Sequence, residues 1–453
     1  MNKVDIAGLK INAVAKVELL AELRDRISRG QKTWLTTPYS EFLHAALLDP
    51  EIMRVLNSAD LAIADGIGLF WAYRYLSIPL IAKSYWGKIL QSGWQIIYSL
   101  AAIIFRPRWI KSSLPEKIPG SDLIWDLAKL AAENNYSIYL LGGFGDTAQL
   151  AAAKLHRTDF LGRENPSDGK VAIAGISNKN PEDKTIIDDI NNSSPGILLV
   201  AFGPIKQEQW IAKNLPELKV NLVVGLGGTF DYLAGKQPQP PQFLRQAGLE
   251  WLWRLFTQPK RVNRIRNATI GLAMGLWRYK VMMNLPFRQN VVSAVINQNG
   301  EVLVAKFNSE KKVLKALGYS RDHFKKFWQF PQGGIESDES IPQASKRELF
   351  EETGMKNVFY LGSSEKTYSY IWEDPARRPL LIKARYQYKG QFQHIAYFKF
   401  LGNDTEIKLD AEELTEYKWV KPENLVTEIH SQKAAIAKII QEDLKEMAKK
   451  AII

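Results

Sequence analysis

Three glutamates, Glu348, Glu351 and Glu352, lie close together in the segment KRELFEETG. On a helix their spacing puts them on one face, where like charges repel. An ordinary surface helix would alternate them with lysines. Three carboxylates on one face make the hard oxygen site that suits Mg²⁺ or Mn²⁺. The pattern therefore predicts a divalent cation, which would bridge diphosphate oxygens, offset their charge and help to activate water.

These glutamates belong to a longer pattern, GGIESDESIPQASKRELFEETGM, which fits the Nudix box without a gap. The box positions are Gly333, Glu339, Arg347, Glu348, Glu351, Glu352 and Gly354. The C-terminal part of the chain thus resembles a Nudix hydrolase. The resemblance implies an α+β Nudix fold (an α/β/α sandwich) over residues 286–453, Mg²⁺ or Mn²⁺ as cofactor, and water attack on a phosphoanhydride. The alternative, a merely solvated acidic face, is weak beside an intact box.

Further segments narrow this resemblance. WQFPQGGI (328–335) and YKGQFQHIAYFKFLG (388–402) are similar to bacterial RNA 5′-pyrophosphohydrolases and dinucleoside polyphosphate hydrolases. EELTEYKWV (412–420) resembles their segment with an additional glutamate, which implies Glu413 as a metal ligand or base beside Glu351; Glu412 and Glu416 stay open as alternatives. The substrate stays open between a nucleoside-diphosphate-linked compound and an RNA 5′ end.

Glycine-rich turns in the N-terminal part form a second set of candidates. ADGIG, LLGGFGD, FGPIKQE and GLGGTFD each follow a predicted strand. In parallel α/β sheets, ligands bind outside the carboxyl ends of the strands. Four such turns predict a nucleotide or sugar-nucleotide site, and tight turns without a ligand are the alternative.

Seven stretches of residues 1–265 occur in the order found in the WecG/TagA/CpsF glycosyltransferases. They are LTTPYSEFL, ADLAIADGIGLFWA, IPGSDL, YLLGGFGDTAQLAAAKL, FGPIKQEQWI, GLGGTFDYLAGK and GLEWLWRLFTQPKRVNRI. The chain resembles that family over this range. The resemblance implies transfer of an N-acetylmannosamine-type sugar from UDP to a polyprenyl-diphosphate-linked acceptor in cell-envelope polysaccharide biosynthesis, with no cofactor expected.

Sugar transfer needs a base for the acceptor hydroxyl and stabilisation of the leaving UDP. Asp65 is the predicted base, with a plain Asp-Gly turn as the alternative, and Thr37 would lie near the donor or the acceptor. The glycines would bring backbone amides to the diphosphate at a helix N-terminus. Gln207 and Glu208 would bind uridine or sugar hydroxyls, and Asp231 would do the same or cap a turn. The predicted substrate-binding residues are Gly66, Gly142, Gly143, Gly145, Lys206, Gln207, Glu208 and Asp231.

The chain departs from the family pattern at several positions near the expected acceptor. Tyr39 stands in place of Asn, Gln239-Pro240-Pro241 in place of Arg-Ala-Pro, and Lys117 in place of Arg. The connection over 78–116 is also longer and contains WQIIYSLAAIIF. These changes leave open an alternative in which the transferase-like part is an inactive, membrane-docked binding module.

The elements that must position these residues follow from the apolar pattern. Strands are predicted at 33–37, 60–64, 136–141, 197–203 and 221–227, and helices at 40–58, 121–134, 146–155 and 206–213. Continuous apolar strands alternating with helices indicate a Rossmann-like parallel sheet over residues 1–242. Residues 243–285 form a basic, Trp-rich helical appendage that would contact a membrane, cap the sheet or bind phosphates. Beyond it, a hairpin around Asn299-Gly300, a strand at 394–402 and a helix at 431–449 are predicted.

Composition limits the classes of function. The chain has 453 residues and no cysteine, which excludes disulfides, thiolate zinc sites and cysteine nucleophiles. Its five histidines argue against a multi-histidine metal site. A net charge of +12 favours acidic partners such as anionic lipid, RNA or phosphorylated substrates. The apolar run 94–105 is shorter than the roughly 20 residues that span a bilayer, so it is either an interfacial segment or a buried helix. No signal peptide is apparent; the expected location is cytoplasmic, peripheral to the inner face of the membrane, with the oligomeric state open.

Overall fold

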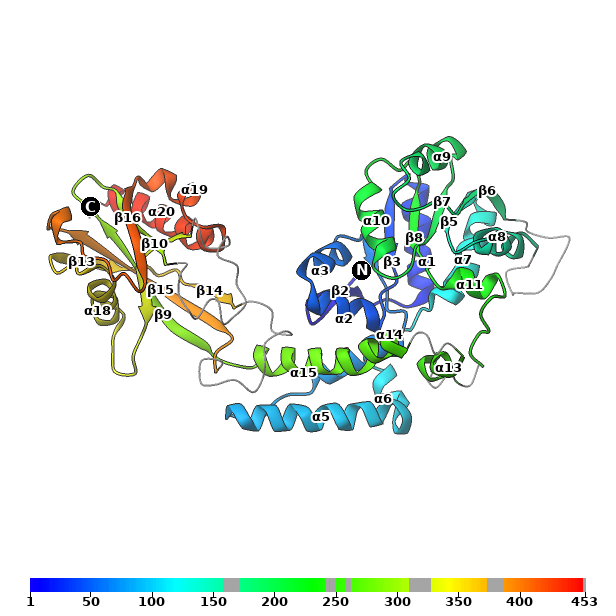
Figure 1. Cartoon of the computed structure of the whole chain (residues 1–453), viewed down its shortest axis with the longest axis horizontal. Coiled ribbons are helices and arrows are strands. Elements are labelled where there is room, and N and C mark those ends of the chain that lie inside the picture. Colours follow the sequence, from blue (N-terminus) through cyan, green and yellow to red (C-terminus); the bar gives the residue numbers. More distant parts are fainter. Residues whose placement is uncertain are drawn as a thin grey trace. The chain divides into compact units, whose positions relative to one another are not determined.

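The computed structural model describes residues 1–157, 171–241, 244, 250–257, 262–308, 327–372 and 387–450. The described residues form two compact units that divide between Asn284 and Leu285. In Figure 1 the first unit runs from blue to green and the second from green to red. The sequence predicts a boundary between residues 285 and 286, one residue beyond this division.

A parallel sheet forms the centre of the first unit. Among the described residues, its strand order is β4-β3-β8-β7-β5-β6, and each neighbouring pair is parallel. The strands are β3 (Thr33–Thr36), β4 (Leu61–Ala62), β5 (Ser137–Gly142), β6 (Ala172–Ser177), β7 (Ile197–Ala201) and β8 (Leu222–Gly225). The predicted Rossmann-like fold is confirmed. Strand β6 was not predicted, because this edge strand is mostly part-exposed and lacks an apolar run.

Helices cover both faces of this sheet. Alternate residues along each strand point to opposite faces, so Leu199 joins one core and Leu198 the other. The helices on the Leu199 face are α1 (Lys16–Ser28), α7 (Gly120–Glu133) and α8 (Thr147–Arg157). Those on the Leu198 face are α3 (Pro50–Asn57), α9 (Thr185–Ser193) and α10 (Lys206–Asn214).

A third core lies beside the sheet and includes the hairpin of β1 (Lys3–Ile6) and β2 (Leu9–Asn12). The helices that contribute to it are α2 (Ser40–Leu48), α4 (Ile67–Ser77), α5 (Tyr85–Phe105), α6 (Pro107–Lys111) and α15 (Leu272–Met283). The predicted helix 40–58 is two helices, α2 and α3, because Asp49 caps α3 and Pro50 is suited to its first turn.

The predicted appendage at 243–285 lies partly outside the described residues, at 243, 245–249 and 258–261. Its described helical parts are residue 244, α13 (Glu250–Thr257), α14 (Val262–Arg266), the π-helix η2 (Asn267–Gly271) and α15. Leu272 and Leu276 of α15 are fully buried in the third core. This part of the appendage is therefore packed into the first unit. A short helix, α11 (Thr229–Leu233), follows β8.

The second unit is a mixed sheet between two layers of helix. Strands β9 and β15 pair in parallel, and the other described pairs are antiparallel. The strands are β9 (Phe287–Ile296), β10 (Val302–Phe307), β11 (Trp328–Gln329), β12 (Gln332–Gly334), β13 (Val358–Ser363), β14 (Tyr368–Ile371), β15 (Gly390–Phe400) and β16 (Leu414–Val420). The antiparallel β9–β10 hairpin, with its turn at Asn299-Gly300, was predicted correctly.

One face of this second sheet packs on α18 (Ile341–Thr353) and the other on α19 (Leu425–Glu428) and α20 (Ala434–Lys449). The remaining short helices are η4 (Asp404–Glu406), η5 (Pro422–Asn424) and η6 (Ser431–Lys433). The predicted α/β/α sandwich is confirmed. The predicted terminal helix 431–449 corresponds to η6 followed by α20.

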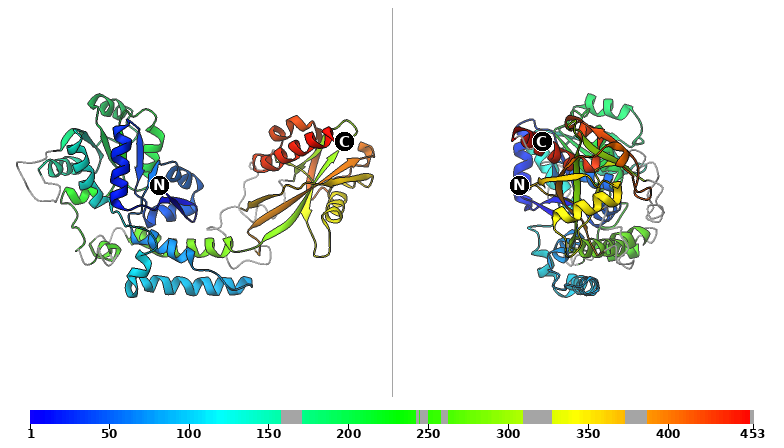
Figure 2. Two further views of the ribbon diagram at one scale, coloured as in Figure 1. Left: turned by 180° about the vertical axis from the view of Figure 1, so that it is seen from behind. Right: turned by 90° about the vertical axis from the view of Figure 1, so that its left-hand side faces the viewer.

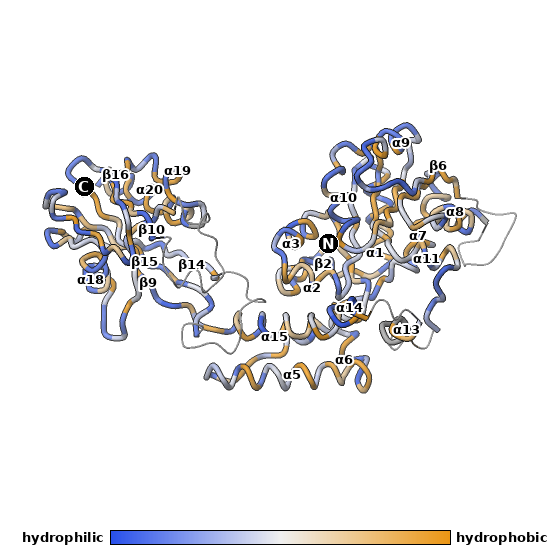
Figure 3. Tube along the Cα trace, in the orientation of Figure 1, coloured by the Kyte–Doolittle hydropathy of each residue, from blue (hydrophilic) through white to orange (hydrophobic). Residues whose placement is uncertain are grey.

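Figure 3 shows hydrophobic residues concentrated in the sheet layers and again in the second half of α5. At 21 residues, α5 covers the whole predicted apolar run and extends nine residues before it. Within the described ranges, no helix has the length and apolarity that a membrane-spanning segment requires.

Candidate functional site

A pocket of about 1550 Å³ opens at the carboxyl edge of the parallel sheet. The predicted residues that line it are Thr37, Asp65, Gly66, Gly142, Gly143, Lys206, Gln207 and Asp231. They lie at or just beyond the carboxyl ends of five strands, β3, β4, β5, β7 and β8, which the parallel topology brings to one edge. Two predicted residues, Gly145 and Glu208, are not among the described residues that line it.

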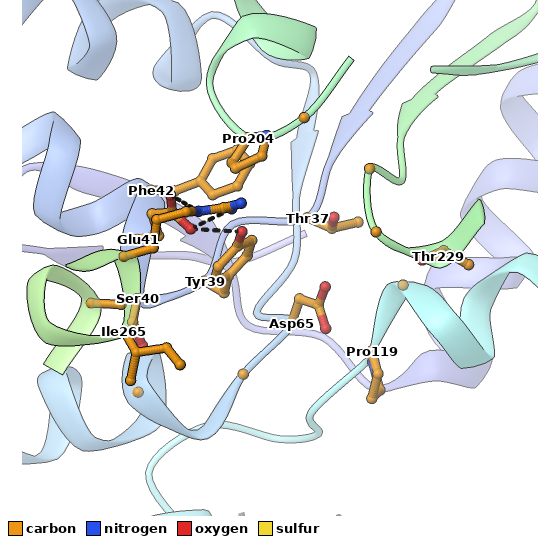
Figure 4. A pocket seen from close by; sticks show the side chains of 18 of the residues that line it. Thr37, Tyr39, Ser40, Glu41, Phe42, Asp65, Pro119, Pro204, Thr229 and Ile265 are labelled. Carbon is orange, nitrogen blue, oxygen red and sulfur yellow. Dashed lines mark hydrogen bonds and ion pairs between the residues drawn. The ribbon is translucent and has the colours of Figure 1, made fainter. Parts of the chain in front are cut away.

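Asp65 lies at the centre of the polar part of this pocket. Its amide donates to the Pro38 carbonyl at 3.0 Å, which fixes the loop after β4 beside the loop after β3. Figure 4 shows its carboxylate pointing into the pocket, with Thr37, Thr229 and Pro119 around it. A carboxylate in that position can accept a proton from a hydroxyl group that enters the pocket.

Glu208 lies beneath the pocket rather than in it. Its side chain is fully buried and accepts hydrogen bonds from Trp34 Nε1 at 3.0 Å and from Gln207 Nε2 at 3.2 Å. Gln207 Oε1 in turn accepts from the Gly227 amide at 3.1 Å. Glu208 thus orients Gln207, and Gln207 holds the glycine loop after β8. The predicted direct contact of Glu208 with uridine or sugar does not fit this placement.

The burial of Glu208 makes a testable prediction about pH. Burial raises the pKa of Glu208 to about 7 from its ordinary value of 4.5. A raised folded-state pKa gives stability that is full below pH 4.5 and is lost as the pH rises through 7. Glu208→Gln is neutral throughout, so relative to this variant the wild type should lose about 2 kcal/mol of unfolding free energy between pH 5.5 and 8. Urea unfolding of both proteins at these two pH values measures this, and parallel pH dependence would contradict it.

The buried side chains of Glu208 and Gln207 leave no room for a Cβ at position 225, which is a glycine. A Cβ at Gly225 would lie 2.4 Å from Glu208 Oε1 and 2.5 Å from Gln207 Nε2, both of which are buried. We expect Gly225→Ala to lower the unfolding free energy by about 1–3 kcal/mol. Gly228→Ala in the same loop is the matched control, because nothing lies within 4 Å of its Cβ position and its φ is −66°. Equal stability of the two variants in urea unfolding would refute the close approach.

Gly142 and Gly143 have backbone conformations that favour glycine, and the amide of Gly143 is already used within the protein. Their φ values are +97° and +80°, and a Cβ on Gly142 would lie 2.7 Å from the Ala201 carbonyl oxygen. The Gly143 amide already donates to that carbonyl at 3.0 Å. Lys236 Nζ lies beside the start of α8, 3.2 Å from the Phe144 carbonyl and 2.9 Å from Thr147 Oγ1. The predicted diphosphate contact with the Gly143 amide is therefore not available in this arrangement.

A strained turn adjoins the pocket at Ile205. The Lys206 amide donates to the Pro204 carbonyl at 2.8 Å, and Ile205 between them has φ 65° and ψ −52°. This three-residue turn is rare and strained, above all for a β-branched residue. Strain of this kind is concentrated at ligand sites. It presents the side chain of Lys206, which has no ion-pair partner among the described residues, at the wall of the pocket.

Arg264 is a pocket residue that the sequence reasoning did not assign to the site. Its guanidinium makes two hydrogen bonds of 2.9 Å to the Glu41 carboxylate, which also accepts from Tyr39 Oη at 3.1 Å. Figure 4 draws these bonds as dashed lines beside Tyr39 and Glu41. The Glu41 carboxylate raises the pKa of Arg264. Arg264 lies in the family-like stretch FTQPKRVNRI, and that membership was the available signal.

In the second unit, two of the three predicted glutamates converge on one positive centre. Arg347 Nη1 lies 2.9 Å from Glu348 Oε1 and 3.2 Å from Glu351 Oε2. Glu352 is buried, and its Oε2 accepts from the Gln332 amide at 3.0 Å. Burial raises the pKa of Glu348. The repulsion that predicted a metal ion is thus partly offset by Arg347, which the charge argument had left out.

The remaining box residues hold this face in place. Arg347 Nε and Nη2 contact the two Glu339 oxygens at 2.6 and 2.7 Å, and Arg347 lowers the pKa of Glu339 to about 2. A Cβ on Gly333 would lie 1.8 Å from Glu348 Cδ, so a larger residue here would displace this carboxylate. Gly354 ends α18 with φ 69°.

The described residues contain no group of three or more His, Asp or Glu placed closely enough to hold a metal ion. The Glu413 amide donates to the Asp410 carbonyl, and the Asp410 amide donates to the Glu352 carbonyl, so this segment runs beside the end of α18. Glu413 is not joined with the other three into one cluster. The donor atoms still suit Mg²⁺, because carboxylate oxygens are the hard ligands that this ion prefers.

A buried lysine beside these residues was missed. Lys433 Nζ lies 3.0 Å from Tyr370 Oη and 3.1 Å from Gln332 Oε1, and burial lowers its pKa to about 7. Gln393 Nε2 also donates to Gln332 Oε1, at 2.7 Å, and Gln393 Oε1 is buried without a partner. Lys433 is far from the Nudix box in the sequence, and nothing in its local pattern distinguishes it from the other lysines near the C-terminal helix.

Comparisons with known families agree with this division of the chain. A model described as Glycosyl transferase WecG/TagA/CpsF family matches residues 4–97 and 87–285, and one described as NUDIX domain matches residues 286–442.

Two curated relatives match the two parts separately. An N-acetylglucosaminyldiphosphoundecaprenol N-acetyl-beta-D-mannosaminyltransferase of Staphylococcus aureus (strain MRSA252) is 22% identical over 273 residues, 59% of this chain and 90% of the relative. An RNA pyrophosphohydrolase of Pelagibacter ubique (strain HTCC1062) is 34% identical over 167 residues, 36% of this chain and 96% of the relative. Among solved structures, the MutT protein of Methanosarcina mazei Go1 is 17% identical, covers 35% of this chain and 96% of its own, and has a TM-score of 0.25.

Proposed function

Because the chain belongs to the glycosyl transferase WecG/TagA/CpsF family over residues 4–285 and carries a Nudix hydrolase domain over residues 286–442, we propose that it is an enzyme with two different activities. The first unit transfers an N-acetylmannosamine-type sugar from a UDP-sugar to a polyprenyl-diphosphate-linked acceptor. The second hydrolyses a phosphoanhydride of a nucleoside-diphosphate-linked substrate and requires Mg²⁺. The enzyme works at the inner face of the membrane.

The observation that supports the transferase is the Asp65 carboxylate in the polar part of a pocket of about 1550 Å³. Pockets for a single small ligand are typically about 300–1,000 Å³, so this pocket has room for both a donor and an acceptor. Asp65 takes the proton of the acceptor hydroxyl as the sugar is transferred. Lys206 pairs with the diphosphate of the donor and stabilises the leaving UDP.

Arg264 and Thr37 complete the transferase site. The planar guanidinium of Arg264, which here makes two hydrogen bonds to Glu41, matches the spacing of oxygens on the acceptor diphosphate. Arg264 takes over the role of the family arginine that Gln239 replaces. Thr37 Oγ1, which donates to the Gly225 carbonyl at 3.2 Å, holds the loops after β3 and β8 together beneath the reacting sugar.

A transfer assay on the full chain tests this function. The full chain is incubated with a panel of UDP-N-acetylhexosamines and N-acetylglucosaminyl-diphosphoundecaprenol, the acceptor in the name of the staphylococcal relative. We expect UDP release together with a lipid product extended by one sugar. Inactivity over the whole panel would favour the alternative, a membrane-docked binding module. Tyr39 and Gln239, which differ from the family pattern, are the sequence support for that alternative.

In the second unit we assign the metal to the acidic face of α18. Glu348, Glu351 and Glu352, with Glu413 from the segment beside the helix, would hold Mg²⁺. The bound ion supplies charge neutralisation for the phosphates. Glu351 or Glu413 removes the proton from the attacking water.

A second candidate for the Nudix substrate is an RNA 5′ end. The 34% identity to an RNA pyrophosphohydrolase favours it, together with the segment WQFPQGGI. The full chain should be assayed on 5′-triphosphorylated RNA, dinucleoside polyphosphates and nucleotide sugars under the same conditions. Activity on nucleotide sugars alone would reject the RNA candidate, and activity on RNA alone would reject the nucleotide-sugar substrate.

A further inference from the structure

Helix α5 turns its polar face inward and its apolar face outward, the reverse of an ordinary surface helix. Its inward face is polar: Ser92 bonds with Tyr75 Oη at 2.6 Å, Ser99 accepts from Trp71 Nε1 at 2.9 Å, and Gln95 accepts from Lys280 Nζ at 2.7 Å. A surface helix normally buries its apolar stripe and exposes its polar one. Here the inward polar groups satisfy one another within the protein, so the apolar face is left to meet the surroundings.

The outward face of α5 is correspondingly apolar and exposed. The side chains of Leu90, Trp94 and Ile97 are 73%, 69% and 62% exposed, and Phe105 at the end of the helix is 81% exposed. Large exposed apolar patches mark interaction or membrane surfaces. This patch therefore requires an apolar occupant.

The pocket that contains Asp65 continues along α5 as an apolar limb. The α5 residues that line it are Gly93, Ile96, Ile97, Leu100, Ile103 and Ile104. Residues of η2 and α15, including Ile270 and Trp277, also line it, and α5 and α15 run side by side in both Figure 1 and Figure 2. Gly93 of α5 lies beside the Trp277 ring of α15, since a Cβ at this position would be at an ordinary contact distance of 3.6 Å from the ring. The polar site thus opens into a hydrocarbon-lined limb walled by α5.

Charge decides between two occupants of the exposed face. Residues 78–115 contain no acidic residue and five basic ones, Lys83, Lys88, Arg106, Arg108 and Lys111. Two copies of α5 facing each other would oppose like charges with no acidic partner. A bilayer with anionic headgroups offers both the apolar layer and the negative charge that this segment lacks.

We infer that the limb walled by α5, η2 and α15 binds the hydrocarbon chain of the lipid-linked acceptor, while the outer face of α5 lies in the boundary between headgroups and acyl chains. The lipid chain then enters the limb from the bilayer and its diphosphate–sugar head reaches Asp65. The inference rests on the proposed transferase function for the identity of the lipid.

Soluble prenyl diphosphates test the limb without a membrane. Calorimetric titration of the full chain should give a Kd for farnesyl diphosphate at least tenfold lower than for dimethylallyl diphosphate, which has the same head and a shorter chain. Ile97→Glu and Trp94→Glu are a matched pair, because both residues are exposed on α5 but only Ile97 lines the limb. Ile97→Glu should abolish the difference between the probes, and Trp94→Glu should leave it within twofold. Both variants should reduce flotation with phosphatidylglycerol-containing vesicles.

Several results would overturn the inference. They are equal affinity for the two probes, equal effects of the two variants on farnesyl diphosphate, or loss of a dimer in both variants with no change in prenyl binding. The transfer assay keeps the two proposals apart. Transfer without dependence on chain length refutes the limb alone, whereas chain-length-dependent binding without transfer refutes the transferase alone.

Discussion

Asp65→Asn is expected to lower the rate of sugar transfer by two to four orders of magnitude, the usual loss when a general base is removed. The change keeps the size of the side chain but removes its negative charge and its ability to take a proton. The Asp65 amide still bonds to the Pro38 carbonyl, so the loop should keep its place. The measurement is the turnover of the full chain at saturating UDP-sugar and acceptor, with the melting temperature as a check on folding.

Asp231→Asn is the matched control for this prediction, because Asp231 lines the same pocket and follows β8 instead of β4. As a binding or capping residue it should change KM and leave kcat within about tenfold. Equal loss of kcat in both variants would show that charge in the pocket matters and not a base at Asp65. Full activity of Asp65→Asn would remove Asp65 from the reaction altogether.

The sequence was sufficient to place Asp65 at the edge of the sheet where the pocket opens, but not to show which of Gln207 and Glu208 faces that pocket. Asp65 follows a buried parallel strand, and that position alone places it at the ligand edge of the sheet. Gln207 and Glu208 are adjacent in the sequence, yet adjacent helix residues point about 100° apart, so one reaches the pocket and the other the core. Which of the two faces the ligand depends on how α10 rotates against the sheet, and a strand-end pattern does not fix that rotation.

The apolar run in α5 shows a related limit. Periodicity identifies an amphipathic or apolar helix, but not which stripe faces the protein. Ser92, Gln95 and Ser99 turn inward because Tyr75, Trp71 and Lys280 offer them partners from two other helices. Those partners are distant in the sequence, so the two interpretations of this run, interfacial segment and buried helix, could not be separated before the helices were assembled.

In the Nudix domain the helix periodicity correctly places Glu348 and Glu351 toward one centre, yet the argument from repulsion was incomplete. Arg347, one position before Glu348, folds across the same face and contacts both carboxylates. Glu352 does not contact Arg347 in the same way, because its Oε2 accepts a hydrogen bond from the Gln332 amide of β12. The spacing of glutamates along one helix carries no information about a strand, such as β12, that packs against that helix.

Glu351→Gln is expected to lower phosphoanhydride hydrolysis by at least two orders of magnitude while leaving stability unchanged. The Glu351 side chain is 55% exposed and its 3.2 Å contact with Arg347 is an exposed ion pair, a kind that contributes at most about 1 kcal/mol. Its loss should therefore affect chemistry and not folding. Hydrolysis of the best substrate from the panel measures the effect, with sugar transfer by the same protein as an internal control.

The dependence of this variant on Mg²⁺ separates the two roles open to Glu351. If the carboxylate is a metal ligand, the apparent Mg²⁺ affinity falls and excess Mg²⁺ restores part of the rate; if it is the base, saturating Mg²⁺ restores nothing and the acidic limb of the pH–rate profile changes. Glu412→Gln, Glu413→Gln and Glu416→Gln, assayed in parallel, then locate the second carboxylate, for which Glu413 is expected. Undiminished hydrolysis in Glu351→Gln, or hydrolysis that persists in excess chelator, would show that the acidic face of α18 is not the catalytic centre. In that case Arg347 alone would account for the clustered glutamates, as the partner that makes them tolerable on one helix.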